Sequence, residues 1–224
     1  MGINKKRIAE RQRAAEAAAK NEKNKKTAQL VAIITAIVAS LAVLGIGIGL
    51  VVNYVQSQPK DYIATIEIED YGTITLELDS EAAPITVDNF VKLANEGFYD
   101  GLTFHRIIEG FMMQGGCPEG TGTGSSDTKI KGEFSSNGWN NPIKHERGVI
   151  SMARGNEVNS GSCQFFIVHE TSPHLDGNYA AFGRVTSGME IVDKICTEAE
   201  PTDSNGTIPK DAQPVIKTIT IKEK

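Results

Sequence analysis

The chain has 224 residues, of which 40% are apolar and 23% charged, a composition that suits one or two globular domains. Neither bulk disorder nor a collagen-like chain fits this composition, because only 22 residues are glycine and the charged fraction is average. Three cysteines exclude a disulfide-dense scaffold. Charge is uneven along the chain: residues 1–26 hold nine basic and three acidic side chains, a net charge of +6, and the remainder carries −11.

Residues 30–52 form an apolar run of 23 residues in which only Thr35 and Ser40 are polar. As a helix this run would be about 35 Å long, enough to cross a hydrocarbon core of about 30 Å. A cleavable signal peptide has a shorter apolar region of about 7–15 residues, although residues 55–57 resemble a weak cleavage site. We therefore expect an uncleaved transmembrane helix over residues 30–52.

The basic segment over residues 1–29 sets the expected orientation of this helix. By the positive-inside rule it stays in the cytoplasm, and the acidic body lies on the extracytoplasmic side of a cell membrane crossed once. A basic head could instead bind nucleic acid. The adjoining apolar run favours an orientation signal that contacts anionic lipid, so we expect a membrane partner and no nucleic acid.

After a linker over residues 53–60, a folded domain is expected over residues 61–224. Apolar and polar residues alternate on both sides of a turn at residues 70–72, which predicts a β-hairpin. A helix is expected to begin at Pro84 and to end at Gly97. Its apolar residues follow helical spacing at Val87, Phe90, Val91 and Ala94.

The rest of the domain reads as short strands joined by glycine-rich connections, with residues 115–127 as a loop. Strands are expected at residues 102–107, 111–114, 149–152, 165–168, 181–185 and 215–221, and a second helix at residues 189–195. This pattern predicts a mostly β fold, an antiparallel sheet closed into a barrel with two helices.

Searches for common catalytic motifs give no metal site and no cofactor. His169 and Glu170 begin a zinc-protease pattern, but Pro173 breaks the helix that the pattern needs. No serine lies in a nucleophile-elbow motif, and the glycines at residues 120–124 have the wrong spacing for a dinucleotide loop. The cysteines lack the spacing of metal ligands, so they are interpreted as small residues without a functional role. Whether two of them form a disulfide is not decided by the sequence. They are Cys117, Cys163 and Cys196. Asn205, Gly206 and Thr207 match a glycosylation sequon of low specificity.

Three segments combine charge with large apolar groups. They are FHRIIEGFMMQGG at residues 104–116, SMARGNEVNSGSCQFFI at residues 151–167, and the stretch from His174 to Val185. In their order and spacing they resemble the cyclophilin family of peptidyl-prolyl cis–trans isomerases, over residues 62–221. The resemblance implies a closed eight-stranded antiparallel β-barrel capped by two α-helices, and an enzyme that rotates Xaa–Pro peptide bonds.

Such a rotation needs an apolar pocket for the proline ring and a hydrogen-bond donor for the prolyl nitrogen, with no nucleophile or cofactor. Arg106 suits the donor role, because its guanidinium stays charged and holds several hydrogen bonds. The resemblance implies that the catalytic residues are Arg106, Phe111 and Gln114. It further implies a substrate-binding set of Met112, Ala153, Arg154, Gly155, Gln164, Phe166, His174, Leu175 and Tyr179. His105 is interpreted as structural.

Two positions depart from the best-known eukaryotic members of the family. His174 stands where cyclosporin-sensitive members carry tryptophan, and Tyr179 stands where they carry histidine. Tryptophan supplies a flat apolar face and an indole N–H that histidine does not reproduce. We therefore expect weak cyclosporin binding with activity retained. The loop that holds Cys163 is also one residue longer than in those members.

The leading hypothesis is a membrane-tethered isomerase that binds proline-containing segments and assists the folding of exported proteins at the outer face of the membrane. The alternative is a non-catalytic chaperone or adaptor that only holds such segments. Arg106 favours the enzyme, because binding alone needs the pocket but no guanidinium at the prolyl nitrogen. A third hypothesis is an anchored surface protein that uses the barrel only as a scaffold. Such a protein would be expected to have lost parts of the family motif, whereas the motif in this sequence is nearly intact.

Overall fold

The alternating residues at the start of the domain form the expected hairpin of β1 (Tyr62–Ile68) and β2 (Gly72–Leu78). In this computed structural model, which describes residue 25 and residues 60–224, Ile66 lies opposite Ile74 and both side chains are fully buried. The chain reverses through Asp70, whose φ of 62° is a left-handed conformation that aspartate tolerates better than most residues.

The other expected strands and both helices are present, with shifted ends. They are α2 (Pro84–Asn95), β3 (Thr103–Ile108), β4 (Met112–Cys117), β5 (Val149–Met152), β6 (Phe165–Val168), β7 (Ala180–Ser187), α3 (Met189–Glu198) and β8 (Ile216–Glu223). Three short 3-10 turns are η1 (Ser135–Asn137), η2 (Pro173–Leu175) and η3 (Lys210–Ala212). The prediction of a loop from residue 115 is wrong for its first three residues, because β4 continues to Cys117.

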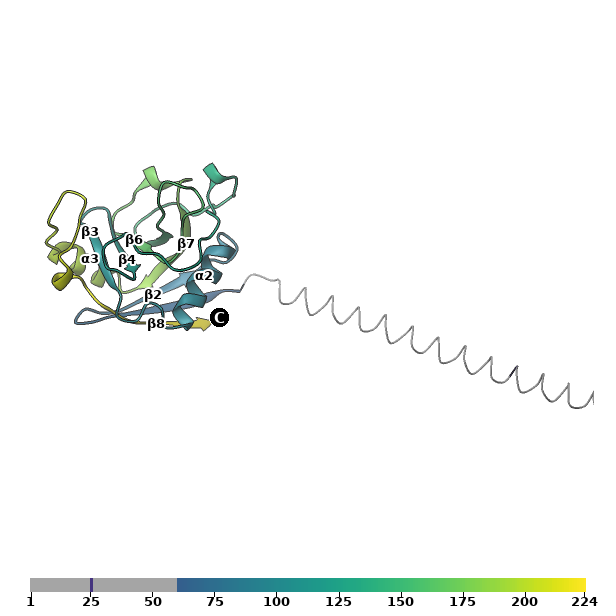
Figure 1. Cartoon of the computed structure of the whole chain (residues 1–224), viewed down its shortest axis with the longest axis horizontal. Helices are drawn as coiled ribbons and strands as arrows, with labels where there is room; N and C mark the ends of the chain where they lie inside the picture. The colour runs from purple at the N-terminus through teal and green to yellow at the C-terminus, as the bar shows by residue number, and fades with distance from the viewer. Residues whose placement is uncertain (1–24, 26–59) are drawn as a thin grey trace, which may run out of the picture. The chain divides into compact units, whose positions relative to one another are not determined.

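The eight strands form one antiparallel sheet in the order β3-β4-β6-β5-β7-β2-β1-β8, strongly curled in Figure 1. The prediction of a closed barrel is wrong: β3 and β8 are edge strands, and the sheet is an open half-barrel. The two edges meet at one end, where Thr103 forms an isolated bridge with Val215. There the Ile216 N–H donates to the Leu102 carbonyl at 2.7 Å.

Beyond this bridge the outer edge of β3 is covered by a different segment. The Ile107 N–H donates to the Gly206 carbonyl at 2.8 Å, and the Ile208 N–H donates to the His105 carbonyl at 3.0 Å. Main-chain groups of an edge strand need partners when they are shielded from water. Residues 206–208 supply those partners, which explains why β8 does not pair along the full length of β3.

The two faces of the sheet bury separate apolar clusters. In β6, the side chains of Phe165 and Ile167 point into the main core, whereas those of Phe166 and Val168 point to the opposite face. The cluster on that opposite face, here named the outer cluster, consists of Met112, Val149, Phe166, Val168, Leu175 and Ala181. Burial on both faces explains why β6 is a continuous apolar run rather than an alternating one.

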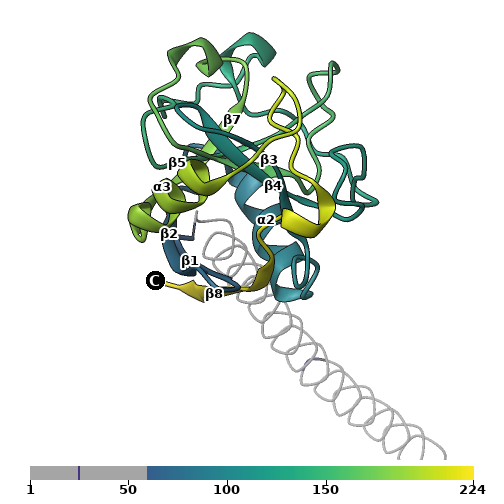
Figure 2. The same cartoon turned by 90° about the vertical axis from the view of Figure 1, so that its left-hand side faces the viewer.

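Both helices lie on the side of the sheet that holds the main core, because Phe90 of α2 and Ile195 of α3 belong to the same buried cluster. There α2 packs against β7 and β8, and α3 packs against β2 and β4 (Figures 1 and 2). No side chain of the residue before α2 caps the helix. Instead the buried carboxylate of Glu133 accepts hydrogen bonds from the Ile85 N–H at 2.9 Å and the Thr86 N–H at 2.8 Å. Glu133 therefore satisfies main-chain donors that the start of a helix leaves free.

Within residues 60–224, no helix is long and apolar enough to cross a membrane. The expected transmembrane helix over residues 30–52, the basic segment over residues 1–29 and most of the expected linker lie outside the described residues. All three cysteines are buried and free.

Candidate active site

Arg106, Gln114 and Phe166 lie side by side across three neighbouring strands. Arg106 of β3 is opposite Gln114 of β4, and Gln114 is opposite Phe166 of β6. Met112 lies on the same face of β4 as Gln114, because alternate residues of a strand share a face. The strand register thus brings a cation, an amide and two large apolar side chains together on the outer face of the sheet.

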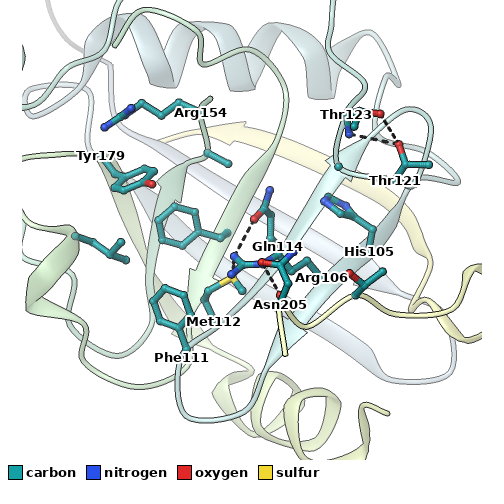
Figure 3. Close-up of a pocket in the computed structure, with 16 residues that line it drawn as sticks. His105, Arg106, Phe111, Met112, Gln114, Thr121, Thr123, Arg154, Tyr179 and Asn205 are labelled. Carbon is teal, nitrogen blue, oxygen red and sulfur yellow. Dashed lines mark hydrogen bonds between the residues drawn. The ribbon is translucent and has the colours of Figure 1, made fainter. Parts of the chain in front are cut away.

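A cavity of about 360 Å³ opens over these residues (Figure 3). Its apolar wall is built from Phe111, Met112, Phe166 and Leu175, of which the last three belong to the outer cluster. Phe166 is fixed by two ring contacts, edge-on to Tyr179 at 5.8 Å between ring centroids and stacked on His145 at 6.0 Å. The wall is therefore shaped before any ligand binds.

The guanidinium of Arg106 is held at the rim of this cavity by acceptors on two sides. Its Nε donates to the main-chain oxygen of Asn205 at 2.7 Å, and Nη1 lies 3.4 Å from Oε1 of Gln114 (Figure 3). Its Cζ is 5.9 Å from the centre of the Phe111 ring. Burial lowers the pKa of Arg106, opposed by Tyr179 and Asp203, and an arginine remains protonated at any working pH.

Gln114 is held in turn by Gln164, so its amide has a defined orientation. The Gln114 Nε2 donates to Oε1 of Gln164 at 2.9 Å. The Gln164 Nε2 donates to the carbonyls of Gly122 at 2.9 Å and Gly124 at 2.8 Å. This relay leaves Oε1 of Gln114 facing Arg106, as hydrogen-bond geometry requires.

Arg154 lies on the opposite side of the cavity from Arg106 and is fixed by main-chain oxygens. Its Nε donates to the Asn178 carbonyl at 2.8 Å and Nη1 donates to the Gly155 carbonyl at 2.9 Å. Its guanidinium also stacks 4.8 Å from the centre of the Tyr179 ring. These contacts fix Arg154 at the wall of the cavity, which Ala153 also lines.

Nine of the twelve predicted site residues line the main cavity. They are Arg106, Phe111, Met112, Gln114, Ala153, Arg154, Phe166, Leu175 and Tyr179. Gly155 and Gln164 line an adjoining cavity of about 290 Å³, which shares Gln114, Ala153 and Arg154 with the first. His174 does not line either cavity and lies beside Phe111, with 5.3 Å between ring centroids.

The cavity also has lining residues that sequence reasoning did not assign to it. They are His105, Gly120, Thr121, Gly122, Thr123, Asn205 and Thr207. The run at residues 120–124 was expected to be a loop, and its glycine content was the signal that it could approach a groove closely. Nothing in the local sequence indicates that Asn205 lies next to Arg106, because that contact depends on the pairing of residues 206–208 with β3.

His105 is buried beside the cavity, and neither ring nitrogen has a hydrogen-bond partner within the described residues. Burial, together with the neighbouring charge of Arg106, lowers the pKa of His105 to about 4. The imidazole is therefore neutral near pH 7 and adds no second charge to the site.

The arrangement combines a cavity that has one apolar wall with a permanent cation and an oriented amide at its rim, and the cavity is large enough for a small ring and the groups next to it. Such a site can hold a small apolar ring and donate hydrogen bonds to polar atoms beside that ring.

The comparisons with known proteins agree with this geometry. Residues 63–223 match the family model described as cyclophilin type peptidyl-prolyl cis-trans isomerase/CLD. The chain belongs to this family. It is therefore a peptidyl-prolyl cis–trans isomerase of the cyclophilin type.

Several bacterial relatives and a solved structure are similar to this cyclophilin domain. Peptidyl-prolyl cis-trans isomerase B of Bacillus subtilis is 52% identical over 146 residues, which is 65% of this chain and 93% of the relative. A Helicobacter pylori isomerase is 51% identical over 138 residues, 61% of this chain and 82% of the relative. A Cryptosporidium parvum cyclophilin, crystallised in the presence of the dipeptide Ala-Pro, superposes with a TM-score of 0.63 at 29% identity. That match covers 72% of this chain and 99% of the solved one.

We predict that His105→Gln weakens the dependence of stability on acid pH. In the folded protein His105 stays neutral down to about pH 4, whereas in the unfolded chain it binds a proton near its ordinary pKa of 6.5. The unfolded state is therefore favoured progressively as the pH falls from 6.5 to 4, by up to about 3 kcal/mol from this residue.

Urea denaturation of both proteins between pH 8 and pH 4 measures this effect. The free energy of unfolding of the wild type should fall more steeply than that of His105→Gln below pH 6.5, and the two slopes should agree above pH 7. Parallel curves over the whole range would contradict the assignment of a neutral, buried His105.

Proposed function

We propose that Arg106 catalyses the rotation of the Xaa–Pro bond by donating a hydrogen bond to the prolyl nitrogen. The observation that carries this proposal is the position of its guanidinium, which is fixed by Asn205 and Gln114 at the rim of an apolar cavity. With Nε occupied by Asn205 and Nη1 by Gln114, Nη2 has no hydrogen-bond partner within the described residues and remains for a substrate. An arginine on an exposed surface, with no cavity beside it and no fixed direction, would not support this role.

The chemistry of the bond explains why one well-placed donor suffices. Amide resonance gives rotation a barrier of about 18–20 kcal/mol. In the twisted transition state the prolyl nitrogen loses that resonance, becomes pyramidal and gains a lone pair. A donor that meets this lone pair stabilises the transition state and not the planar ground state. Accelerating the reaction by about five decades requires roughly 7 kcal/mol of such stabilisation.

The apolar wall of the cavity supplies the second requirement, a fixed proline ring. Phe111, Met112, Phe166 and Leu175 form one wall of the cavity, and a proline ring seated against this wall would displace water from beside the guanidinium. Exclusion of water strengthens the hydrogen bond from Arg106. Gln114 supplies an amide that suits the carbonyl side of the rotating bond, and the segment of residues 153–155 offers main-chain groups to a peptide backbone.

The location of the reaction is a second part of the proposal. The apolar run over residues 30–52 and the preceding basic segment support an anchor that crosses the membrane once, with the cyclophilin domain on the extracytoplasmic side. An isomerase in that place would act on proline-containing segments of exported proteins as they fold. Slow isomerisation of such segments limits folding rates, so an anchored catalyst is useful there.

We predict that Arg106→Ala reduces the catalysed exchange rate by about a hundredfold or more while a proline peptide still binds. Exchange spectroscopy by NMR on an alanine–proline model peptide measures the rate, and titration of the peptide measures binding. Phe166→Ala is the matched comparison, because it opens the apolar wall and should weaken binding itself. A wild-type protein that binds the peptide without accelerating exchange would instead support a non-catalytic chaperone or adaptor.

We predict that cyclosporin inhibits this protein more weakly than it inhibits a family member with tryptophan at the position of His174. His174 is exposed and contacts Phe111, so it lies where a ligand that covers the cavity would reach. His174→Trp should lower the inhibitor concentration needed for half inhibition, measured relative to the uninhibited exchange rate of the same variant. Equal potency against the wild type and a tryptophan-bearing relative would contradict this prediction.

We predict that the full-length chain sediments with membranes and resists extraction by salt and alkali. In intact cells stripped of any wall or outer barrier, added protease should remove the cyclophilin domain and spare the basic segment. A variant that lacks residues 30–52 is the control and should be soluble. Full protection of the domain in intact cells would contradict the proposed orientation.

A further inference from the structure

The turn of residues 202–207 follows α3 in the chain and holds the guanidinium of Arg106. The carbonyl of Asn205 accepts from Nε of Arg106 at 2.7 Å, the shortest hydrogen bond of this side chain. The bond to Gln114 on the other side is longer, at 3.4 Å. The direction of the guanidinium thus depends mainly on where the turn places one main-chain oxygen.

Two main-chain hydrogen bonds and one glycine fix this turn against β3. The Ile107 N–H donates to the Gly206 carbonyl at 2.8 Å, and Thr207 forms an isolated bridge with Arg106. Gly206 has φ of 85°, and a Cβ atom there would lie 2.6 Å from the Ile107 carbonyl and would also collide with the Ile108 side chain. Only glycine allows this close approach of the turn to the strand.

The carboxylate of Asp203 closes the turn from within. Its two oxygens accept from the Thr207 N–H at 3.1 Å and from the Thr207 hydroxyl at 2.9 Å. Its main-chain carbonyl accepts from the Gly206 N–H at 3.1 Å. The hydrogen bonds from Thr207 lower the pKa of Asp203, which keeps the carboxylate charged. The carboxylate forms no ion pair with Arg106 within the described residues. Its charge raises the pKa of Arg106 from a distance, and its hydrogen bonds act on the direction of the arginine through the turn.

We propose that Asp203 is a positioning residue for catalysis, which holds the Asn205 carbonyl in place and so aims the Arg106 guanidinium at the cavity. The inference rests on the isomerase activity and on Arg106 as its donor. Asp203 and Thr207 close the turn, Gly206 lets it touch β3, and the carbonyl of Asn205 orients the arginine. The apolar wall of the cavity comes from other segments of the chain, and the turn contributes only Asn205 and Thr207 to the lining.

This separation gives a specific kinetic signature for Asp203→Ala in the full-length chain, solubilised in a mild detergent. Without the carboxylate the turn keeps its main-chain hydrogen bonds but loses both bonds to Thr207. The Asn205 carbonyl is then held less firmly and Arg106 samples other directions, so kcat should fall by about ten- to a hundredfold. KM should remain at the wild-type value, because the apolar wall is intact. Asp203→Asn keeps one acceptor for Thr207 and should lose less. Asp211→Ala removes an exposed carboxylate of η3, outside the turn of residues 202–207, and its kcat should match the wild type.

A double-mutant cycle with Arg106→Lys separates positioning from a general structural effect. Lysine keeps the charge but has no Nε–H group for Asn205 to hold, so Asp203→Ala should cause no further loss of kcat in that background. An unchanged kcat in Asp203→Ala, a loss confined to KM, or an undiminished loss of kcat in the Arg106→Lys background would each overturn the proposal. The wild type and Asp211→Ala show whether the protein has isomerase activity at all. If both lack activity, the proposed function is wrong, and this outcome is distinct from a failure of the positioning role of Asp203.

Discussion

The hydrogen bond from Nε of Arg106 to the main-chain oxygen of Asn205 links the catalytic strand to a turn 99 residues further along the chain. A guanidinium with five donors can adopt many directions, and its use in catalysis depends on restricting them. Here the restriction comes from a backbone carbonyl, whose position is set by strand pairing rather than by a flexible side chain. The open edge of β3 is therefore part of the site.

The same edge explains why the sheet remains a half-barrel. If β8 paired with β3 along its full length, residues 206–208 would have no edge to join and Asn205 would not reach Arg106. The apolar side of the site depends on a different property of the sheet, namely that β6 is buried on both faces. Phe166 can face the cavity because Phe165 and Ile167 hold the strand from the core side.

Sequence reasoning succeeded where the signal is local. The alternation of apolar residues indicates which face of β1 and β2 is buried, and the helical spacing after Pro84 indicates the buried face of α2. These elements were therefore predicted correctly. Nine predicted site residues meet at one cavity because the family motif preserves the strand register that joins them. Their individual roles remain predictions until substitutions are measured.

Features that depend on non-local contacts were missed or wrong. Closure of the barrel was expected from several short strands with glycine-rich connections and from the family resemblance. The sequence pattern does not show that residues 206–208, rather than β8, pair with the outer part of β3. The sequence also does not show that Glu133 caps α2 or that Asn205 contacts Arg106, because each of these contacts joins residues far apart in the chain. Asn205, Gly206 and Thr207 matched a sequon, and this pattern carries no information about the carbonyl that the turn provides.

The most direct test of the account is a crystal structure of the protein with a bound alanine–proline peptide. The account predicts that the proline ring lies against Phe111, Met112 and Phe166, with an Nη atom of Arg106 on the side of the prolyl nitrogen and Nε still bonded to Asn205. A proline ring bound elsewhere, or a guanidinium turned away from the peptide with the ring in place, would contradict the central claim.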